Sequence, residues 1–309
     1  MEQLVSWETV NIKICCDENM DIKEYLPLYY EIKEYKGETF CKSIVVKTNK
    51  KPEIIWREEI NTVIFCVREL SSEVYNAVNV LLNVLIKRTL QERGIYILHA
   101  SSVIIDDRIV LLFGSSGSGK TAAAMGLACS EHVSFLSNGS TIVSYDGNTV
   151  KVCGTYKSGI KIRKSTLKQY DEDLCSRIFG QQDEEVNFDC KQVLSPAQFG
   201  FRDGRGQDVE QYDKIEFYII QLDSLNTDLK HRTDFDYKLS MQLFEDLNRE
   251  MNGSEVYISI NNQPIYVPSF DNKQLCLNRI HFINYFMNHY FSGVLMGGLE
   301  ELKTKILMG

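Results

Sequence analysis

The chain has 309 residues, of which 44% are hydrophobic and 25% are charged, and its formal net charge is −8. This length and composition indicate a globular protein with one large domain or two ordinary ones. The acidic balance argues against nucleic acid or an anionic membrane as the main partner, and we expect neither.

Targeting and metal signals are weak throughout the chain. The longest apolar stretch, residues 78–86, is interrupted by Asn79 and Asn83 and is too short to span a bilayer. The amino terminus lacks a basic region followed by an apolar one, so no signal peptide is expected. The nine cysteines contain no C-x-x-C pair, which argues against a zinc site and favours the reduced thiols of a cytoplasmic protein.

The first hundred residues predict strands followed by one long helix. Residues 54–56 and 62–67 are rich in β-branched and aromatic side chains and are the clearest strands. A helix is expected to begin at Ser71 or Ser72, because apolar residues then recur at helical spacing, and to end near Gly94. Beyond it, residues 96–105 and 109–113 predict a hairpin that turns at Asp106 and Asp107.

The remaining elements are predicted from apolar periodicity and turn residues. They are a second hairpin over 141–145 and 149–152, a buried strand over 214–222, and helices over 237–249 and 280–291.

The pattern G-x-x-x-x-G-K-[ST], typical of phosphate-binding P-loops, follows the strand predicted at 109–113. The matching residues are Gly114, Ser115, Ser116, Gly117, Ser118, Gly119, Lys120 and Thr121. Glycines let main-chain amides approach a phosphate, the lysine adds positive charge, and the threonine hydroxyl would ligate Mg²⁺. The alanine-rich segment 121–128 predicts the helix whose amino terminus should face the phosphates. We therefore expect a nucleoside triphosphate with Mg²⁺, and the pattern does not distinguish ATP from GTP.

The stretch from Arg93 to Val103 (RGIYILHASSV), followed by the loop at 114–121, resembles the HPr kinase/phosphorylase-like family. The likeness covers roughly residues 80–165, and the stretch around His99 is more specific than the P-loop alone. The resemblance implies an α/β fold, namely a P-loop nucleotide-binding domain of the HPr kinase/phosphoenolpyruvate carboxykinase-like type with a mixed sheet, preceded by a smaller α+β region. We expect residues 1–92 to form that amino-terminal region and residues 93–309 to form the kinase-like domain.

The same resemblance implies an ATP-dependent phosphotransferase that acts on a serine hydroxyl of a protein or peptide, and it leaves room for a homo-oligomer. Lys120 would stabilise charge, and His99 matches a histidine near the transferred phosphate. The family's aspartate pair, however, is replaced by Asn138 and Gly139. Asn138 cannot accept a proton as a carboxylate does, and a general base is typically worth about 10²–10⁴-fold in rate.

Other groups could replace the missing base. His99 has a suitable ordinary pKa, whereas Asp146 reads better as a turn residue and Asp223 as an ordinary strand end. A basic cluster follows the loop and reads either as a solvated face or as a clamp for phosphates or an acidic peptide. It comprises Lys157, Lys161, Arg163, Lys164 and Lys168.

The sequence therefore supports three functions. The first is an active kinase, because phosphoryl transfer depends mainly on positioning and charge stabilisation. The second is a catalytically degenerate relative that binds nucleotide for regulation or to engage a partner, which the loss of the aspartate pair favours. The third is a small-molecule kinase that uses the same loop.

Overall fold

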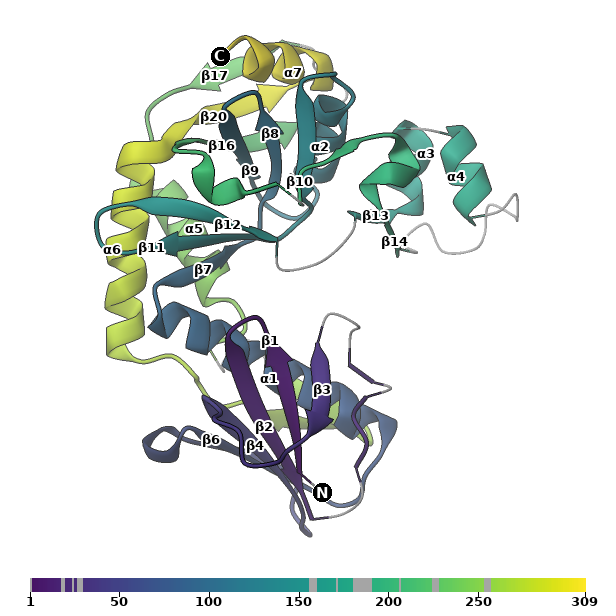
Figure 1. Cartoon of the computed structure of the whole chain (residues 1–309), viewed down its shortest axis with the longest axis vertical. Coiled ribbons are helices and arrows are strands. Elements are labelled where there is room, and N and C mark those ends of the chain that lie inside the picture. The colour runs from purple at the N-terminus through teal and green to yellow at the C-terminus, as the bar shows by residue number, and fades with distance from the viewer. Residues whose placement is uncertain are drawn as a thin grey trace. The chain divides into compact units, whose positions relative to one another are not determined.

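The computed structural model describes residues 2–17, 20–23, 25–26, 30–155, 160–170, 172–179, 191–205, 207–223, 228–252 and 257–309. In this part the chain is a mixed α/β structure with parallel and antiparallel strands (Figure 1). It divides into two compact units: unit 1 comprises Met1–Tyr96 and Phe244–His281, and unit 2 comprises Ile97–Leu243 and Phe282–Gly309. No helix in the described part is long and apolar enough to cross a membrane.

Unit 1 differs from the expected amino-terminal domain of residues 1–92, because it also contains the later segment 244–281. Its described strands form a six-stranded sheet in the order β3-β1-β2-β4-β6-β5. The strands are β1 (Glu2–Trp7), β2 (Val10–Cys16), β3 (Glu31–Glu34), β4 (Lys42–Thr48), β5 (Glu53–Arg57) and β6 (Thr62–Val67). The later segment contributes the hairpin of β18 (Tyr257–Ile260) and β19 (Gln263–Tyr266).

The helix α1 (Ser72–Glu92) packs on this sheet against β2 and β4. Its apolar residues recur every three or four positions, so Val74, Val78, Leu81 and Leu85 are fully buried. The helix follows Ser71 as predicted, and Gly94 adopts a left-handed φ of 72° just after its end.

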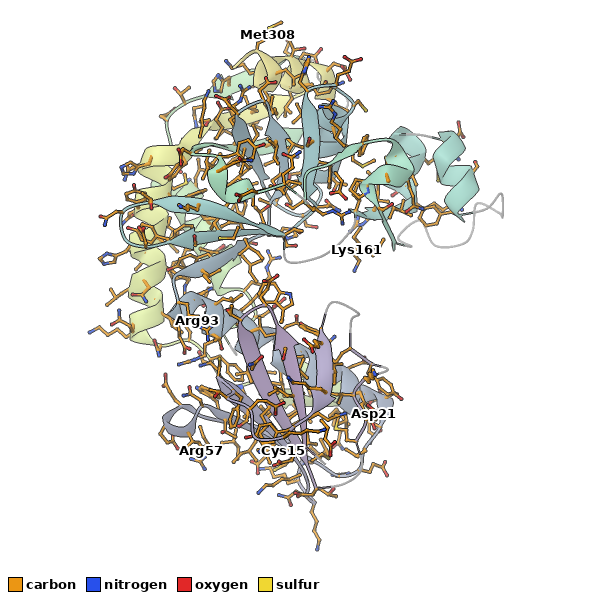
Figure 2. All side chains as sticks on the ribbon, viewed as in Figure 1. Cys15, Asp21, Arg57, Arg93, Lys161 and Met308 are labelled. Atoms are coloured by element: carbon orange, nitrogen blue, oxygen red, sulfur yellow. The ribbon has the colours of Figure 1, made fainter. Side chains whose placement is uncertain are left out.

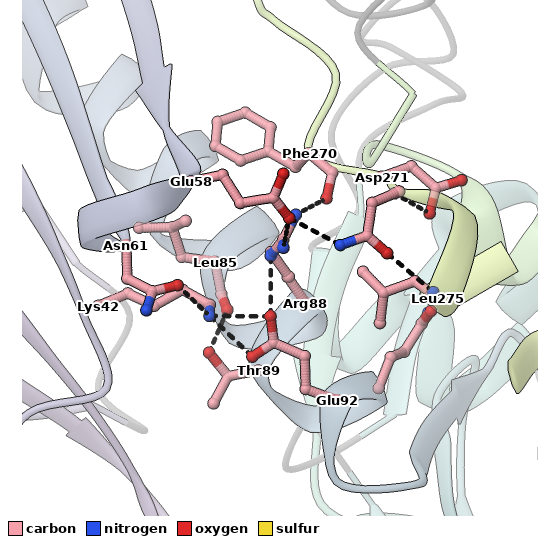
Figure 3. A network of polar contacts seen from close by, with 12 residues as sticks. Lys42, Glu58, Asn61, Leu85, Arg88, Thr89, Glu92, Phe270, Asp271 and Leu275 are labelled. Atoms are coloured by element: carbon pink, nitrogen blue, oxygen red, sulfur yellow. Dashed lines mark hydrogen bonds and ion pairs between the residues drawn. The ribbon is translucent and has the colours of Figure 1, made fainter.

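A charged network centred on Arg88 joins α1 to the rest of unit 1 (Figure 3). The guanidinium donates to Glu92 at 2.9 Å, to Glu58 at 2.6 Å and to the carbonyl oxygen of Phe270. The ammonium of Lys42 on β4 lies 2.7 Å from the second oxygen of Glu92. Because Phe270 belongs to the later segment, the network fastens that segment to the first ninety residues, and apolar periodicity gives no sign of it.

A second buried arginine in unit 1, Arg279, also joins the later segment to α1. Arg279 is 0% exposed, donates to Gln91 at 2.9 Å and forms an ion pair with Asp271. The amide nitrogen of Gln91 in turn donates to the carbonyl oxygen of Leu247 at 2.9 Å. These contacts hold the chain on either side of β18 and β19 against α1.

Unit 2 is built on a seven-stranded sheet of described strands in the order β15-β10-β8-β9-β16-β20-β17. The strands are β8 (Ser101–Ile105), β9 (Arg108–Phe113), β10 (Val133–Ser137), β15 (Arg202–Asp203), β16 (Lys214–Leu222), β17 (Lys230–Arg232) and β20 (Phe291–Gly297). Neighbours β9, β16 and β20 are parallel, whereas β8 pairs antiparallel with β9 in the predicted hairpin. The helices α2 (Lys120–Ala128) and α7 (Leu299–Met308) pack together, and α2 covers β8, β9 and β10.

Smaller elements complete unit 2. A three-stranded sheet has the order β12-β11-β7, and β13 pairs with β14. The bounds are β7 (Ile95–Leu98), β11 (Thr141–Tyr145), β12 (Val150–Thr155), β13 (Ile160–Arg163), β14 (Lys191–Leu194), α3 (Lys164–Tyr170) and α4 (Glu172–Phe179). Short 3-10 helices lie at Glu58–Ile60 in unit 1 and at Pro196–Phe199 and Val209–Gln211 in unit 2.

Two sequence predictions need correction. Residues 96–105 form two strands instead of one, because β7 joins the three-stranded sheet and β8 the large one, with the break at His99 and Ala100. The helix predicted over 280–291 is α6 (Lys273–Tyr290), which begins earlier because the side-chain oxygen of Asn272 accepts the main-chain N–H of Leu275 at 2.9 Å. The helix α5 (Tyr237–Asn248) matches its prediction closely, and α5, α6 and β7 each continue from one unit into the other.

Candidate functional site

The glycine-rich loop of residues 114–119 connects the end of β9 to the start of α2, as the sequence predicts. Gly117 and Gly119 have φ angles of 83° and 89°, a region that residues with a side chain rarely adopt. The first turn of α2 contains no acidic residue, and Gly119 caps it without a side-chain hydrogen bond. The amino-terminal N–H groups of α2 therefore keep the positive end of the helix dipole at the loop.

The loop lies against the end of the neighbouring parallel strand β16. The main-chain N–H of Leu222 donates to the carbonyl oxygen of Ser118 at 2.9 Å. A Cβ atom added to Gly119 would come within 2.5 Å of Leu222 Cδ1 and 2.7 Å of its Cβ, so glycine is required for packing as well as for conformation. The loop thus occupies the carboxyl edge of parallel strands, where α/β proteins commonly bind ligands.

Lys120 lies back along the loop instead of extending away from it. It is only 7% exposed, and its Nζ donates to the carbonyl oxygens of Gly114 at 2.7 Å and Ser115 at 2.9 Å. Both acceptors are main-chain carbonyl groups of the loop. The lysine is therefore held beside the main-chain amides that the sequence motif predicts for phosphate binding.

Thr121 and Asn138 meet at the first turn of α2. Thr121 Oγ1 donates to Asn138 Oδ1 at 2.8 Å, and Ser101 on β8 donates to the same oxygen at 3.2 Å. Asn138 Nδ2 donates to the carbonyl oxygen of Lys161 on β13 at 3.0 Å. Asn138 is 8% exposed, so a buried amide connects the helix, the large sheet and β13.

His99 completes the group of residues singled out from the sequence. A Cβ atom added to Gly139 would lie 3.8 Å from His99 Cε1, which places the imidazole beside the residue that follows Asn138. Lys120, Thr121, Asn138 and His99 are thus brought to one region of unit 2. Their chemical roles stay predictions.

The other two candidates for the missing base, Asp146 and Asp223, differ in where they lie and in what they bind. Asp146 is a turn residue, because its carboxylate accepts the main-chain N–H groups of Asn148 and Thr149, each at 2.8 Å. These two hydrogen bonds hold the pKa of Asp146 below its usual range. Asp223 follows β16 directly and is exposed, and its main-chain N–H donates to Gly297. Asp223 therefore lies one residue beyond the contact between β16 and the loop.

The basic cluster is only partly described, since Lys157 lies outside the described residues. The side chain of Lys161 projects outward from β13 (Figure 2), because alternate residues Ile160 and Ile162 are buried. Its carbonyl oxygen, by contrast, points to Asn138. Lys161 therefore presents its charged side chain to solvent, while its main chain is hydrogen-bonded to Asn138, the residue that contacts Thr121.

Sequence reasoning missed the buried hydroxyl groups behind the site. Ser102, Ser137 and Thr141 are hydrogen-bonded to one another at 2.6–3.1 Å, and all three are almost completely buried. Pairing between β8 and β10 shifts register between Phe135 and Ser137, a bulge that re-aims the chain before Asn138. The only sequence signal was polar residues next to one another in an otherwise apolar strand, as at Ser101 and Ser102.

No group of three or more His, Cys, Asp or Glu side chains that could hold a metal ion occurs within the described residues. The first turn of α2 carries the hydroxyl group of Thr121, which donates to the amide oxygen of Asn138. Hard neutral oxygens of this kind suit Mg²⁺ when phosphate oxygens supply the other ligands.

Comparison with known proteins adds little to this geometry. No family model matches the chain, and no curated protein matches it. Among solved structures the chain is similar to the Hpr(Ser) kinase/phosphatase from Coxiella burnetii, at 13% identity over 62% of this chain and 91% of that chain, with a TM-score of 0.24. A likeness at this level is too low to establish fold or activity, so the function proposed below rests on the chain's own residues.

Proposed function

We propose that unit 2 binds ATP with Mg²⁺ at residues 114–121 and transfers the γ-phosphoryl group to a hydroxyl, as an HPr-kinase-like phosphotransferase would. The observation that carries the proposal is the loop itself. It brings the left-handed Gly117 and Gly119, the buried ammonium of Lys120 and the uncapped start of α2 together at the carboxyl edge of β9. Such a helix start binds anions through its N–H groups and its dipole.

One further feature supports an anion at this place. Lys120 contacts carbonyl oxygens of the loop, and a phosphate oxygen would be a stronger, charge-assisted acceptor for the same ammonium.

Thr121 would hold the metal ion, with Asn138 behind it. A bound Mg²⁺ would draw charge from the β- and γ-phosphate oxygens and so stabilise the leaving group. Mg²⁺ keeps several waters and takes few protein ligands, so a threonine hydroxyl with substrate phosphates is an adequate set.

The transfer step balances without a cofactor beyond ATP. The acceptor oxygen forms a bond to the γ-phosphorus, the bond from that phosphorus to the bridging oxygen breaks, and ADP leaves with the bonding electron pair. The acceptor proton must go to a base. His99 lies beside Gly139, the residue that follows Asn138, and we assign it this role. The acceptor implied by the resemblance around His99 is a serine of a protein or peptide.

Calorimetry with magnesium-complexed ATP tests the binding. We expect a dissociation constant between about 1 μM and 1 mM, the range typical of enzyme–substrate pairs. Transfer is then tested by mass spectrometry of serine-containing peptides after incubation with the chain and ATP, where the expected product carries one added phosphoryl group. No heat of association with millimolar nucleotide would refute the proposal.

A second candidate, a nucleotide-binding regulatory protein without transfer activity, is favoured by one observation. Asn138 stands at the position expected for a catalytic base, and its amide is engaged by Thr121, Ser101 and Lys161. Single-turnover experiments separate the two functions, because a regulatory site would hold ATP intact through many times its residence time, whereas a kinase would convert it to ADP when an acceptor is present.

A further inference from the structure

Asn138 lies where the proposed site would need a carboxylate, yet its surroundings are specific for an amide. We propose that Asn138 is a positioning residue with two roles: its oxygen fixes the Thr121 hydroxyl for a metal ion, and its nitrogen fastens β13 to the end of β10. The first role rests on the proposed function, whereas the second depends on the fold alone.

The orientation of the amide follows from its partners. The carbonyl oxygen of Lys161 can only accept a hydrogen bond, so the group that faces it at 3.0 Å must be the Nδ2 donor. Oδ1 then faces Thr121 and Ser101, and both hydroxyls must donate to it, at 2.8 Å and 3.2 Å. No other assignment of the amide gives each of these contacts a proton.

The consequence for Thr121 is chemical. Because its proton points to Asn138, both lone pairs of Oγ1 point elsewhere and remain available to a cation. A hydroxyl that ligates a metal keeps its proton, which needs an acceptor behind it, and such supporting partners typically change metal affinity about 10–100-fold. Asn138 provides that acceptor without adding charge, so metal binding should depend strongly on the nucleotide phosphates.

Aspartate would meet only half of these requirements. A carboxylate oxygen in place of Oδ1 would still accept from Thr121 and Ser101. Its second oxygen, however, would face the carbonyl oxygen of Lys161 with no proton between them, so that carbonyl would lose its donor and meet a negative charge. An aspartate here is therefore expected to keep the acceptor function and to lose the attachment of β13.

The experiment compares five variants of the full chain by two measurements. The first is the ratio of ATP dissociation constants in EDTA and in MgCl₂, which isolates the effect of the metal. The second is the melting temperature without nucleotide. The variants are Asn138→Ala, Asn138→Asp, Thr121→Val, Thr121→Ser and Thr141→Val. Thr141→Val is the structural control, since it removes a buried hydroxyl of unit 2 whose hydrogen bonds are to Ala100, Ser102 and Ser137.

We expect Asn138→Ala to reduce the magnesium effect on ATP affinity by about 10–100-fold and to lower the melting temperature by several degrees. Thr121→Val should abolish the effect, and Thr121→Ser should retain it. Asn138→Asp should retain the magnesium effect while lowering the melting temperature, and Thr141→Val should do the same.

Two results would overturn the inference. If Asn138→Ala kept the magnesium effect at the level of Thr141→Val, the oxygen would not position Thr121. If Asn138→Asp melted at the wild-type temperature, the nitrogen would not fasten β13. Failure of the wild-type chain to bind ATP is a different outcome, which refutes the proposed function and the metal role together while the melting comparison still decides the other role.

Discussion

Unit 1 and unit 2 each bury a polar network, but the networks differ in charge. In unit 1, Arg88 and Lys42 are matched by the carboxylates of Glu58 and Glu92, and the ions come from distant parts of the sequence. In unit 2, the network around Asn138 consists of hydroxyl and amide groups. A network of matched ions holds segments together. A neutral network adds no charge, so the electrostatic potential near the loop is set by the amino terminus of α2 and by Lys120.

This contrast is one reason to place the candidate site in unit 2. A buried cation that loses its counter-ion destabilises a protein strongly, so we expect the network around Arg88 and Lys42 to resist the rearrangement that a ligand would require. Hydroxyl and amide groups exchange partners at lower cost, and a loop of main-chain N–H groups offers positive potential without a counter-ion. The predictions below test this division, beginning with the largest expected effect.

Replacing Arg88 by alanine should destabilise unit 1 by about 3–5 kcal/mol, because removal of this buried side chain leaves a cavity and takes the donor from the buried carbonyl oxygen of Phe270. Both tryptophans of the chain, Trp7 and Trp56, lie in unit 1, so fluorescence during urea unfolding reports on it. The exposed Arg57→Ala is the control and should change stability by less than about 0.5 kcal/mol. Equal effects of the two variants would mean that the network is incidental to the fold.

Replacing Gly119 by alanine should be the most damaging single change in the loop. The new Cβ would be strained at a φ of 89° and would clash with Leu222, adding about 1–3 kcal/mol of overpacking to about 1–2 kcal/mol of conformational cost. Gly117→Ala is the matched control, since its φ is 83° and nothing lies within 4 Å of an added Cβ. Chemical unfolding followed by far-ultraviolet circular dichroism compares them.

The contact with Leu222 is tested by combining the changes. The double variant Gly119→Ala, Leu222→Ala should lose less stability than the sum of the two single variants, because the effects of residues in contact are not additive. If Gly119→Ala cost no more than Gly117→Ala, the close approach of β16 to the loop would be wrong.

Replacing Lys120 by alanine should weaken ATP binding by about 10–150-fold, the loss expected for a charge-assisted hydrogen bond of about 1.5–3 kcal/mol. The control is Lys214→Ala, which removes an exposed lysine at the start of β16, the opposite end of the strand from the loop. Equal binding by both variants in calorimetry would remove Lys120 from the site.

A structural feature could be predicted from the sequence when the residues that determine it lie close together in the chain. The strand at 214–222 and the hairpin at 141–145 were predicted nearly to the residue, since apolar patterning and a tight turn act within a few positions. The loop at 114–119 was found because its glycines and lysine are contiguous. The break between β7 and β8 was missed, because sheet membership depends on which partners each half finds.

The long-range contacts of the site lay beyond such reasoning. Asn138 was singled out because it replaces a carboxylate, whereas its partners Ser101 and Lys161 are 37 and 23 positions away and no motif links them to it. The return of residues 244–281 to unit 1 depends on ions such as Arg88 and Arg279, whose partners cannot be paired from one sequence. Composition and periodicity describe faces and lengths, but they do not say which buried polar groups meet.

The smallest expected effect concerns a charged cluster that unit 2 keeps at the end of its strands away from the loop. Tyr218 on β16 is 4% exposed and donates to Glu216 at 3.2 Å, while Arg108 at the start of β9 pairs with the same carboxylate. Burial, and then the Glu216 charge, raises the pKa of Tyr218 to about 12, from an ordinary value of 10.

Between about pH 10 and 12 the folded state therefore keeps a phenolic proton that the unfolded state releases. Stability contributed by this proton is complete below pH 10 and is lost as pH rises towards 12, with a slope of at most about 1.4 kcal/mol per pH unit. Tyr218→Phe removes the ionisable group, so its stability relative to wild type should improve across this window and be constant below it. Unfolding monitored by circular dichroism at pH 9, 10 and 11 measures the difference, and a pH-independent difference would show that Tyr218 ionises equally in both states.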